Sequence, residues 1–209
     1  MTPRTALERG VQTMGLALSA GVEEQLMKYT ELLAKWNRTY NLTAVREPLA
    51  MVSHHLLDSL AVLPHLDFAH GDARLADIGS GGGLPGIPLA LARPQWHVAL
   101  VESNEKKAAF LQQAKIELQL SNVEIQAQRV EAWRPAERFA IVISRAFAEL
   151  SDFVAACKHI LAPGGVIAAM KGKDPQDEVA RVSGYRCTTV TLHVPFLGGE
   201  RHLVLCEPK

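Results

Sequence analysis

Residues 77–88, Asp-Ile-Gly-Ser-Gly-Gly-Gly-Leu-Pro-Gly-Ile-Pro, are the stretch that decides the fold. An apolar run around Leu75 precedes them, as expected for a short buried strand. The run from Ile87 to Leu91 follows, as expected for a helix with Pro85 or Pro88 in its first turn. A strand, a glycine turn and a helix in this order predict a nucleotide-binding βα unit, because glycines let a ligand approach the backbone and the helix start offers free N–H groups.

Three cofactor classes compete for this turn. A phosphate-binding P-loop needs a terminal Gly-Lys-Ser/Thr, and no lysine occurs between Asp77 and Arg93. A dinucleotide fold needs Gly-x-Gly-x-x-Gly, which Gly81, Gly83 and Gly86 satisfy. Asp77, however, would repel a pyrophosphate but could meet the ammonium of a methionine moiety. Acid-x-Gly-x-Gly-x-Gly resembles the first motif of S-adenosylmethionine (SAM) methyltransferases, and a glycine turn without a ligand is the remaining alternative.

Composition sets further limits. The 209 residues suit one domain with a small appendage, and 48% of them are hydrophobic, enough for a full core. Lys+Arg and Asp+Glu are equal at 22 each, so any RNA contact must use local patches. Three cysteines (Cys157, Cys187, Cys206) without a CxxC motif argue against zinc and against a disulfide framework. No signal peptide or membrane span is indicated, which predicts a cytoplasmic protein.

The N-terminal third is predicted to be helical. Apolar residues from Val22 to Trp36 recur at helical spacing, Asn37–Arg46 is expected to be a loop, and a second helix is expected from Pro48 to Pro64. Residues 1–70 are therefore predicted to form a helical cap over a methyltransferase domain at 71–209, within one compact unit.

Strands and helices alternate from Leu75 onward, which predicts a doubly wound parallel sheet. Ser103 is the expected N-cap of the helix that follows the second strand. Two further strands separated only by a short loop predict a terminal antiparallel hairpin. The expected fold is α/β and Rossmann-like, with a mostly parallel seven-stranded sheet of the SAM-methyltransferase type. After Leu75, the expected strands are Val98–Val101, Val123–Ala127, Phe139–Ile143, Val166–Met170, Thr188–Val194 and His202–Cys206.

Ligands of open α/β sheets bind at the carboxyl ends of the strands, and this rule selects candidate site residues. Asp77 and Gly79 follow the first strand, and Glu102 ends the second, where it could accept both ribose hydroxyls of an adenosine. Val130 and Glu131 follow the third strand, where a backbone N–H and a carboxylate could read an adenine. The fourth ends at Arg145, the single charge between Phe139 and Ala148, which either holds the methionine carboxylate or orients the target base.

Several motifs resemble one family. Together with the glycine motif, Lys35–Pro48 (KWNRTYNLTAVREP), His54–Leu60 (HHLLDSL) and Val142–Phe147 (VISRAF) are similar to the bacterial ribosomal RNA small-subunit methyltransferase G family, also called glucose-inhibited division protein B. LAPGG, MKG and GERHLV follow in matching order. The resemblance implies SAM-dependent methylation of guanine N7 in 16S ribosomal RNA, in a loop near the decoding site. The resemblance also implies cofactor-site positions at Gly79, Leu84, Val130, Glu131 and Arg145. The glycine motif and the strand ends add four further candidates for cofactor binding: Asp77, Gly81, Gly83 and Glu102.

The residues fit this chemistry. Guanine N7 carries a lone pair and no proton, so in-line transfer needs alignment but no general base, and Arg145 is the predicted catalytic residue. The chain lacks the Asn/Asp-Pro-Pro-Tyr/Phe element typical of exocyclic-amine methyltransferases. Methylation of carbon 5 of a pyrimidine needs a nucleophilic cysteine near the site, whereas Cys157 is expected in the core.

Four basic residues are candidates for phosphate contacts or for ordinary solvated charges: Lys106, Lys107, Lys171 and Arg201. Lys106-Lys107 stands where the family usually has Lys-Arg, which loses a planar guanidinium. His54 and His55 are adjacent and do not share a helix face, so no metal site is predicted. The expected partner is 16S ribosomal RNA within the small subunit, and a monomer without membrane contact is expected. The alternatives are a methyltransferase for another RNA or a small molecule, and an NAD-binding oxidoreductase or non-catalytic nucleotide binder.

Overall fold

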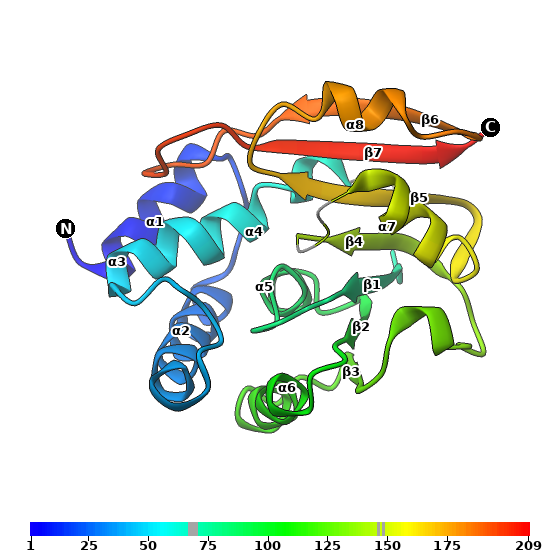
Figure 1. Cartoon of the computed structure of the whole chain (residues 1–209). Helices are drawn as coiled ribbons and strands as arrows, with labels where there is room; N and C mark the ends of the chain where they lie inside the picture. Colours follow the sequence, from blue (N-terminus) through cyan, green and yellow to red (C-terminus); the bar gives the residue numbers. More distant parts are fainter. Residues whose placement is uncertain (67–70, 146, 148) are drawn as a thin grey trace.

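The computed structural model describes residues 1–66, 71–145, 147 and 149–209. Its centre is a seven-stranded sheet in the order β3-β2-β1-β4-β5-β7-β6 (Figure 1). Strands β1 to β5 pair in parallel, whereas β7 pairs antiparallel with β5 and β6. The predicted parallel sheet with a terminal antiparallel hairpin is confirmed. The strands are β1 Arg74–Ile78, β2 His97–Val101, β3 Val123–Gln126, β4 Phe139–Ser144, β5 Leu161–Lys171, β6 Tyr185–Thr191 and β7 His202–Pro208.

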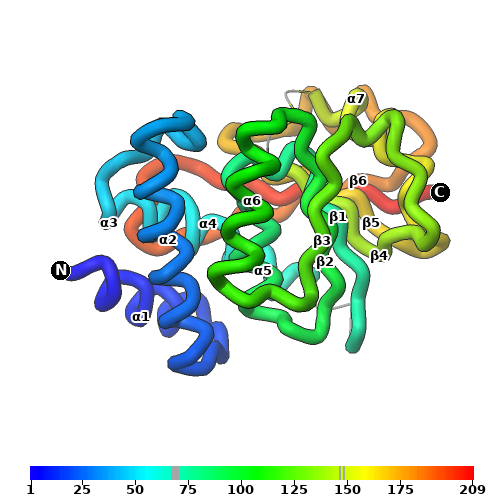
Figure 2. Tube along the Cα trace, turned by 90° about the horizontal axis from the view of Figure 1, so that it is seen from below, coloured from blue at the N-terminus to red at the C-terminus, as the bar shows by residue number. Residues whose placement is uncertain are grey.

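Helices cover both faces of the sheet because both faces of its strands are apolar. Leu75 and Ile141 point into one hydrophobic cluster, whereas their neighbours Ala76 and Val142 point into a second cluster. Helices α5 and α6 pack on the first face, between the sheet and α2, and α7 lies on the opposite face (Figures 1 and 2). These helices are α5 Gly86–Ala92, α6 Glu105–Glu117, α7 Leu150–Cys157 and α8 Gln176–Ala180, with a 3-10 turn, η3 Val130–Ala132.

The N-terminal residues form a helical layer beside α5 and α6 (Figure 2). Buried side chains of this layer, such as Leu26 and Leu57, belong to the same hydrophobic cluster as Leu75 of the sheet. The predicted boundary between residues 70 and 71 borders residues 67–70, which lie outside the described residues, so the division into cap and domain stays a prediction. The elements are α1 Pro3–Thr13, α2 Ala20–Tyr40, α3 Pro48–Met51, the π-helical η1 Val52–Leu57, α4 Asp58–Leu60 and the 3-10 turn η2 Leu63–His65.

Two local predictions about helix ends were wrong. Helix α2 continues to Tyr40 and ends at Asn41, whose φ of 50° is left-handed, so residues 37–40 are not loop. Asn37 is buried and its Oδ1 accepts a hydrogen bond from the N–H of Thr43 at 2.9 Å, which ties the following loop back to the helix. The cap of α6 is Asn104, whose Oδ1 accepts from two backbone N–H groups, and not Ser103.

The expectation that the cysteines form no disulfide was also wrong. Cys187 and Cys206 are directly opposite in the β6–β7 pairing, with their Cα atoms 4.1 Å apart, and they form a disulfide. The predicted strand started one residue too late to include Cys187. Cys157 is a free buried thiol, as expected for a core residue.

No helix in the described part of the chain is long and apolar enough to cross a membrane. No group of three or more His, Cys, Asp and Glu side chains within those same residues is arranged to hold a metal ion.

Candidate active site

Asp77 holds the glycine loop in place through a buried hydrogen bond. Its Oδ2 accepts a hydrogen bond from the N–H of Gly86 at 2.8 Å, and its Oδ1 has no partner among the described residues. Burial raises the pKa of Asp77 to about 7, although the Gly86 N–H and the Arg145 charge both lower it. A Cβ on Gly86 would meet the side chain of Leu100 and would lie 2.8 Å from Asp77 Oδ2. The helix start and the acid are thus in contact only because residue 86 is glycine.

Glu102 joins this loop to the next one. Its Oε2 accepts from the N–H of Gly81 at 2.9 Å and its Oε1 from the N–H of Asn104 at 2.8 Å. A carboxylate offers about four acceptor positions, so two remain for a ligand such as a ribose diol. Gly81 has a φ of 57°, and a Cβ there would meet only the carbonyl oxygen of Gly79, at 3.8 Å. The loop therefore presents bare backbone to open space beside a buried carboxylate.

A cavity of about 150 Å³, here named the loop cavity, lies beside this loop. It brings together three predicted cofactor residues, Gly79, Val130 and Glu131, with Phe147 on its wall. The ring of Phe147 packs on Phe153 with centroids 4.9 Å apart, so its edge is held in place. The lining residues are Ile78, Gly79, Val101, Ser103, Gln128, Arg129, Val130, Glu131 and Phe147.

Leu84 and Gly83 do not line the loop cavity. Leu84 is buried in the core, and its N–H donates to the carbonyl of Ser80 at 3.0 Å. The N–H of Gly83 donates to the same carbonyl at 2.7 Å. In this structure both residues shape the loop from within.

Arg145 lies in a group that the sequence did not reveal. Its Nη1 donates to the carbonyl oxygen of His54 at 3.0 Å and to Asp58 Oδ2 at 3.2 Å. Nε of Arg201 donates to the other oxygen of Asp58 at 3.1 Å. The Asp58 side chain is only 4% exposed. The sequence signal that could have identified Asp58 is its place between Leu57 and Leu60, in an otherwise apolar helical stretch. An acid that is buried there needs a buried partner.

This group borders a second cavity of about 290 Å³, here named the arginine cavity. It lies between the cap, the carboxyl end of β5 and the amino end of the antiparallel β7. Its wall consists of Val45, His54, His55, Asp58, Arg145, Met170, Lys171, Gly172, Leu192, Arg201 and His202. Burial and the Arg145 charge lower the pKa of His55 to about 4, so this ring is neutral at pH 7.

The four candidate RNA-binding residues fall into two places. Lys106 is exposed and Lys107 half-buried at the start of α6. Lys171 and Arg201 line the arginine cavity, where Lys171 Nζ is 2.6 Å from Glu178 Oε2 and 3.1 Å from the carbonyl oxygen of Phe147. Their contact with phosphate stays a prediction.

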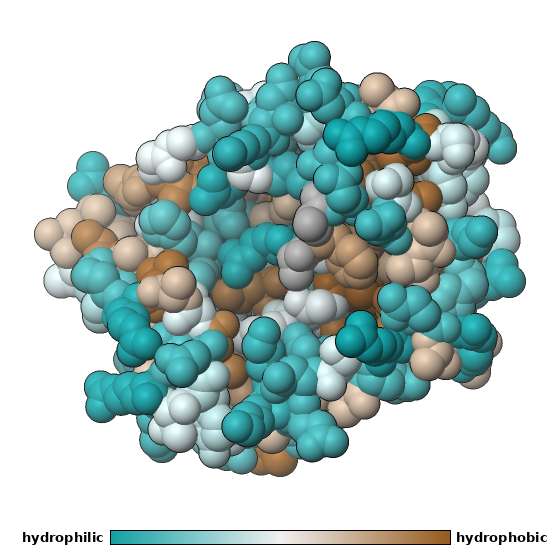
Figure 3. Space-filling view, viewed as in Figure 1, coloured by the Kyte–Doolittle hydropathy of each residue, from teal (hydrophilic) through white to brown (hydrophobic). Residues whose placement is uncertain are grey.

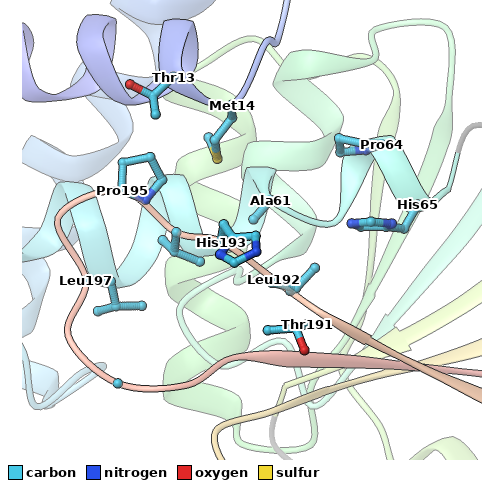
Figure 4. Close-up of a pocket in the computed structure, with 12 residues that line it drawn as sticks. Thr13, Met14, Ala61, Pro64, His65, Thr191, Leu192, His193, Pro195 and Leu197 are labelled. Carbon is cyan, nitrogen blue, oxygen red and sulfur yellow. The ribbon is translucent and has the colours of Figure 1, made fainter.

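The surface reflects this arrangement. Figure 3 shows a recess in the middle of one face, where hydrophobic residues are visible below a mostly hydrophilic rim. A larger cavity, about 510 Å³, lies elsewhere, between α1, η2 and the β6–β7 loop (Figure 4). Its wall includes His65 and His193, and among the described residues that line it there is no acid, lysine or arginine and no predicted site residue.

Comparison with known proteins supports the fold and identifies the family. The solved structure of DhpI in complex with SAH is 18% identical to this chain, with a TM-score of 0.58 over 91% of this chain and 98% of that chain. A precorrin-6y C5,15-methyltransferase from Geobacter metallireducens is 16% identical, with a TM-score of 0.56 over 82% and 93% of the two chains. Both likenesses support the methyltransferase fold alone.

Relatives by sequence are much more similar. "Ribosomal RNA small subunit methyltransferase G" of Aromatoleum aromaticum is 55% identical over 96% of this chain and 97% of its own length. The protein of the same name from Nitrosospira multiformis is 50% identical, over 99% and 98%. The family model for rRNA small subunit methyltransferase G matches residues 22–204. The resemblance found in the sequence is confirmed, and the chain belongs to the rRNA small subunit methyltransferase G family.

Proposed function

We propose that this protein transfers the methyl group of SAM to N7 of a guanosine in the 16S ribosomal RNA of the small subunit. The observation that carries the proposal is the glycine loop, held between the buried acids Asp77 and Glu102 and opening on the loop cavity. The names of its sequence relatives support ribosomal RNA of the small subunit as the acceptor.

The residues around the loop fit SAM. Glu102 retains acceptor positions for the ribose hydroxyls, and the apolar wall at Val130 and Phe147 suits an adenine ring. Asp77 Oδ1, which has no partner in the described part of the chain, suits a cationic ammonium nearby. When bound, SAM supplies an electrophilic methyl group on a sulfonium.

The chain has only to align the acceptor. N7 carries no proton, so no side chain must remove one, and catalysis can rest on proximity and orientation. His55 is neutral at pH 7, and its Nε2 lies 2.9 Å from Thr43 Oγ1, so it is already engaged. Arg145 is positioned by Asp58 and the His54 carbonyl, and it is close enough to Asp77 to lower the pKa of that acid. It is therefore the residue best placed to act between cofactor and base.

The test is methyl transfer from labelled SAM to small subunits from cells that lack this protein, followed by mapping of the product. We expect 7-methylguanosine at one position, at least a hundredfold slower formation with Arg145→Ala, and partial recovery with Arg145→Lys. Arg186→Ala, which removes an exposed arginine of β6, is the matched control and should be as active as the parent. No labelling of subunits or of free 16S RNA, despite SAM binding measured by calorimetry, would contradict the proposal.

The same assay separates two modes of recognition. Assembled subunits and naked RNA are compared as acceptors, and the faster one is the substrate. A small-subunit substrate would place the protein in the cytoplasm, and sedimentation during the assay would test the predicted monomer.

A further inference from the structure

The arginine cavity is assembled by three distant segments of the chain. Asp58 and Arg145 are 87 residues apart in sequence, and Asp58 and Arg201 are 143 apart. The bonds to Asp58 therefore hold together the cap, the end of β4 and the hairpin. Arg145 lines this cavity, whereas Phe147, two residues later, lines the loop cavity. The two cavities are thus lined by residues only two positions apart in the chain.

The π-helical turn of η1 prepares this contact. In an α-helix the N–H of Asp58 would bond the carbonyl of His54. Here it donates to the carbonyls of Ser53 and His55 instead. The His54 carbonyl is thereby available to Arg145, which donates to it at 3.0 Å. Such π-helical turns occur often at functional sites, where they present backbone groups that a regular helix would hide.

The cavity also contains hydrogen-bonding atoms that lack partners within the described residues. Nδ1 of His55 and Nδ1 of His202 are buried without a hydrogen bond there, and both residues are less than a tenth exposed. Asp58 accepts one bond from each arginine through its two oxygens, which leaves further acceptor positions. Buried polar atoms are rarely left unpaired, so this set points to a polar ligand.

We propose that the arginine cavity receives the target guanine base, with Arg145 and Arg201 donating to O6 and Asp58, which holds both arginines, accepting from N1–H. The inference rests on the proposed function and adds the site and the chemistry of base recognition. O6 and N1–H are adjacent on the base, as the arginines and Asp58 are adjacent on the wall. N7 lies on the other side of O6 and would face the loop cavity. Enzymes that modify a base commonly take it out of the stack into such a pocket.

The charges on the wall favour guanine over other occupants. An adenine would place its exocyclic amine against a guanidinium and would offer no hydrogen from N1 to Asp58. A backbone phosphate in the same cavity would be repelled by the carboxylate of Asp58. The exposed Lys106 offers a phosphate a contact outside this cavity, away from that carboxylate. Base recognition therefore explains both the acid and the arginines.

The first experiment measures kcat and KM for small subunits, and the Kd for SAM, with Asp58→Asn, Arg201→Ala and Arg201→Lys. We expect kcat to fall about tenfold to a hundredfold for Asp58→Asn and Arg201→Ala, with the Kd for SAM changed less than twofold. Arg201→Lys should recover part of the rate. Arg186→Ala, on the same hairpin, should change neither value.

The second experiment tests the base itself. Small subunits are reconstituted with 2-aminopurine at the target position, which keeps N7 but lacks O6 and N1–H. We expect the parent to prefer guanine by about tenfold to a hundredfold, and Asp58→Asn to reduce that preference towards one. A loss of folding alone would not change this ratio, so the measurement separates recognition from stability.

Three results are decisive against the inference or its basis. Equal rates on guanine and 2-aminopurine with the parent would overturn it while leaving the proposed function intact. A salt-dependent rise in KM for Arg201→Ala, with kcat and base preference unchanged, would overturn it in favour of a phosphate contact. Failure of the parent to methylate guanine N7 in any subunit would remove the proposed function, and this inference with it.

Discussion

The loop cavity and the arginine cavity take wall residues from nearby positions, Phe147 and Arg145, but the chain builds the two sites in different ways. The glycine loop beside the first cavity is local in sequence, because Asp77, Gly81 and Gly86 lie within ten residues and the loop is held through the backbone N–H groups of Gly81 and Gly86. The rest of that cavity's wall comes from the segments that follow β2, β3 and β4. The second depends on side chains from three distant segments, joined at Asp58. A local backbone site can be found from a motif, whereas a site made by distant side chains requires the fold. Substitutions should therefore separate the two: changes at the loop should act on SAM affinity, and changes at the arginine cavity on turnover.

The largest effect is expected from the pH dependence of Asp77→Asn. The folded-state pKa of Asp77 is about 7, above the ordinary value of 3.8, so the folded state binds more protons between these values. Stability from this group is therefore present at low pH and is lost as pH rises from about 4 to about 7, by about 4 kcal/mol at most. His55 changes stability in the opposite direction: its pKa is lowered from 6.5 to about 4, so its contribution to stability rises as pH rises through this range. The Asp77→Asn variant keeps His55, so the difference from the parent isolates the acid.

Urea unfolding from pH 4 to pH 8 measures this difference. The variant should gain stability relative to the parent as pH rises to about 7, and the gain should then level off. The exposed Asp72→Asn serves as control and should follow the parent throughout. A constant difference between Asp77→Asn and the parent across the range would show that Asp77 is not raised in pKa.

Gly86→Ala is expected to damage the loop cavity while leaving the arginine cavity assembled. The added Cβ would meet Leu100 and the Asp77 carboxylate, which should cost about 3 kcal/mol of unfolding free energy and most of the SAM affinity. Chemical denaturation and calorimetry with SAM measure the two effects. Gly198→Ala is the matched control, because a Cβ there meets nothing within 4 Å. Gly86→Ala with parental SAM affinity would show that the loop adjusts more easily than this packing implies.

Glu102→Gln should separate cofactor affinity from turnover. Glutamine has a single acceptor oxygen, so only one of the bonds from Gly81 and Asn104 can remain, and the charge that favours ribose hydroxyls is lost. We expect the Kd for SAM to rise about tenfold, with kcat at saturating SAM close to that of the parent. The exposed Glu105→Gln, in the first turn of α6, is the control. An unchanged Kd would mean that Glu102 only joins the two loops.

The order of the fold was largely predictable from the sequence, because apolar runs and helical periodicity reflect burial directly. The sheet and its hairpin were predicted correctly, and Asp77, Glu102 and Val130 lie at or just after the carboxyl ends of β1, β2 and β3, as the strand pattern indicated. Their contact with a cofactor stays a prediction. The C-terminal end of α2 and the N-cap of α6 were not predicted correctly. Asn37 and Asn104 act there through side-chain hydrogen bonds, which composition does not show.

Pairings between distant residues could not be predicted from the sequence. Cys187 and Cys206 are joined only because the hairpin register places them opposite each other. Asp58 is the corresponding case in the site. Its segment was predicted as a regular helix, whereas a π-helical turn and two distant arginines give it its place. The arginine cavity is thus a product of tertiary structure, and only Arg145, Lys171 and Arg201 of its charged residues were candidates beforehand.

Tyr29→Phe should have the smallest effect, and it tests how far the cap supports the loop. The Tyr29 hydroxyl, buried in α2, donates to the carbonyl oxygen of Gly82 at 2.6 Å, and burial raises the pKa of Tyr29, which keeps the proton in place. Loss of this bond should cost about 1 kcal/mol of stability and raise the Kd for SAM twofold to threefold, with kcat unchanged. Tyr40→Phe, an exposed tyrosine of the same helix, should behave like the parent. A fall in kcat at saturating SAM with Tyr29→Phe would instead show that the two cavities are coupled through the cap, so that the local loop and the assembled arginine cavity could not be treated as separable parts.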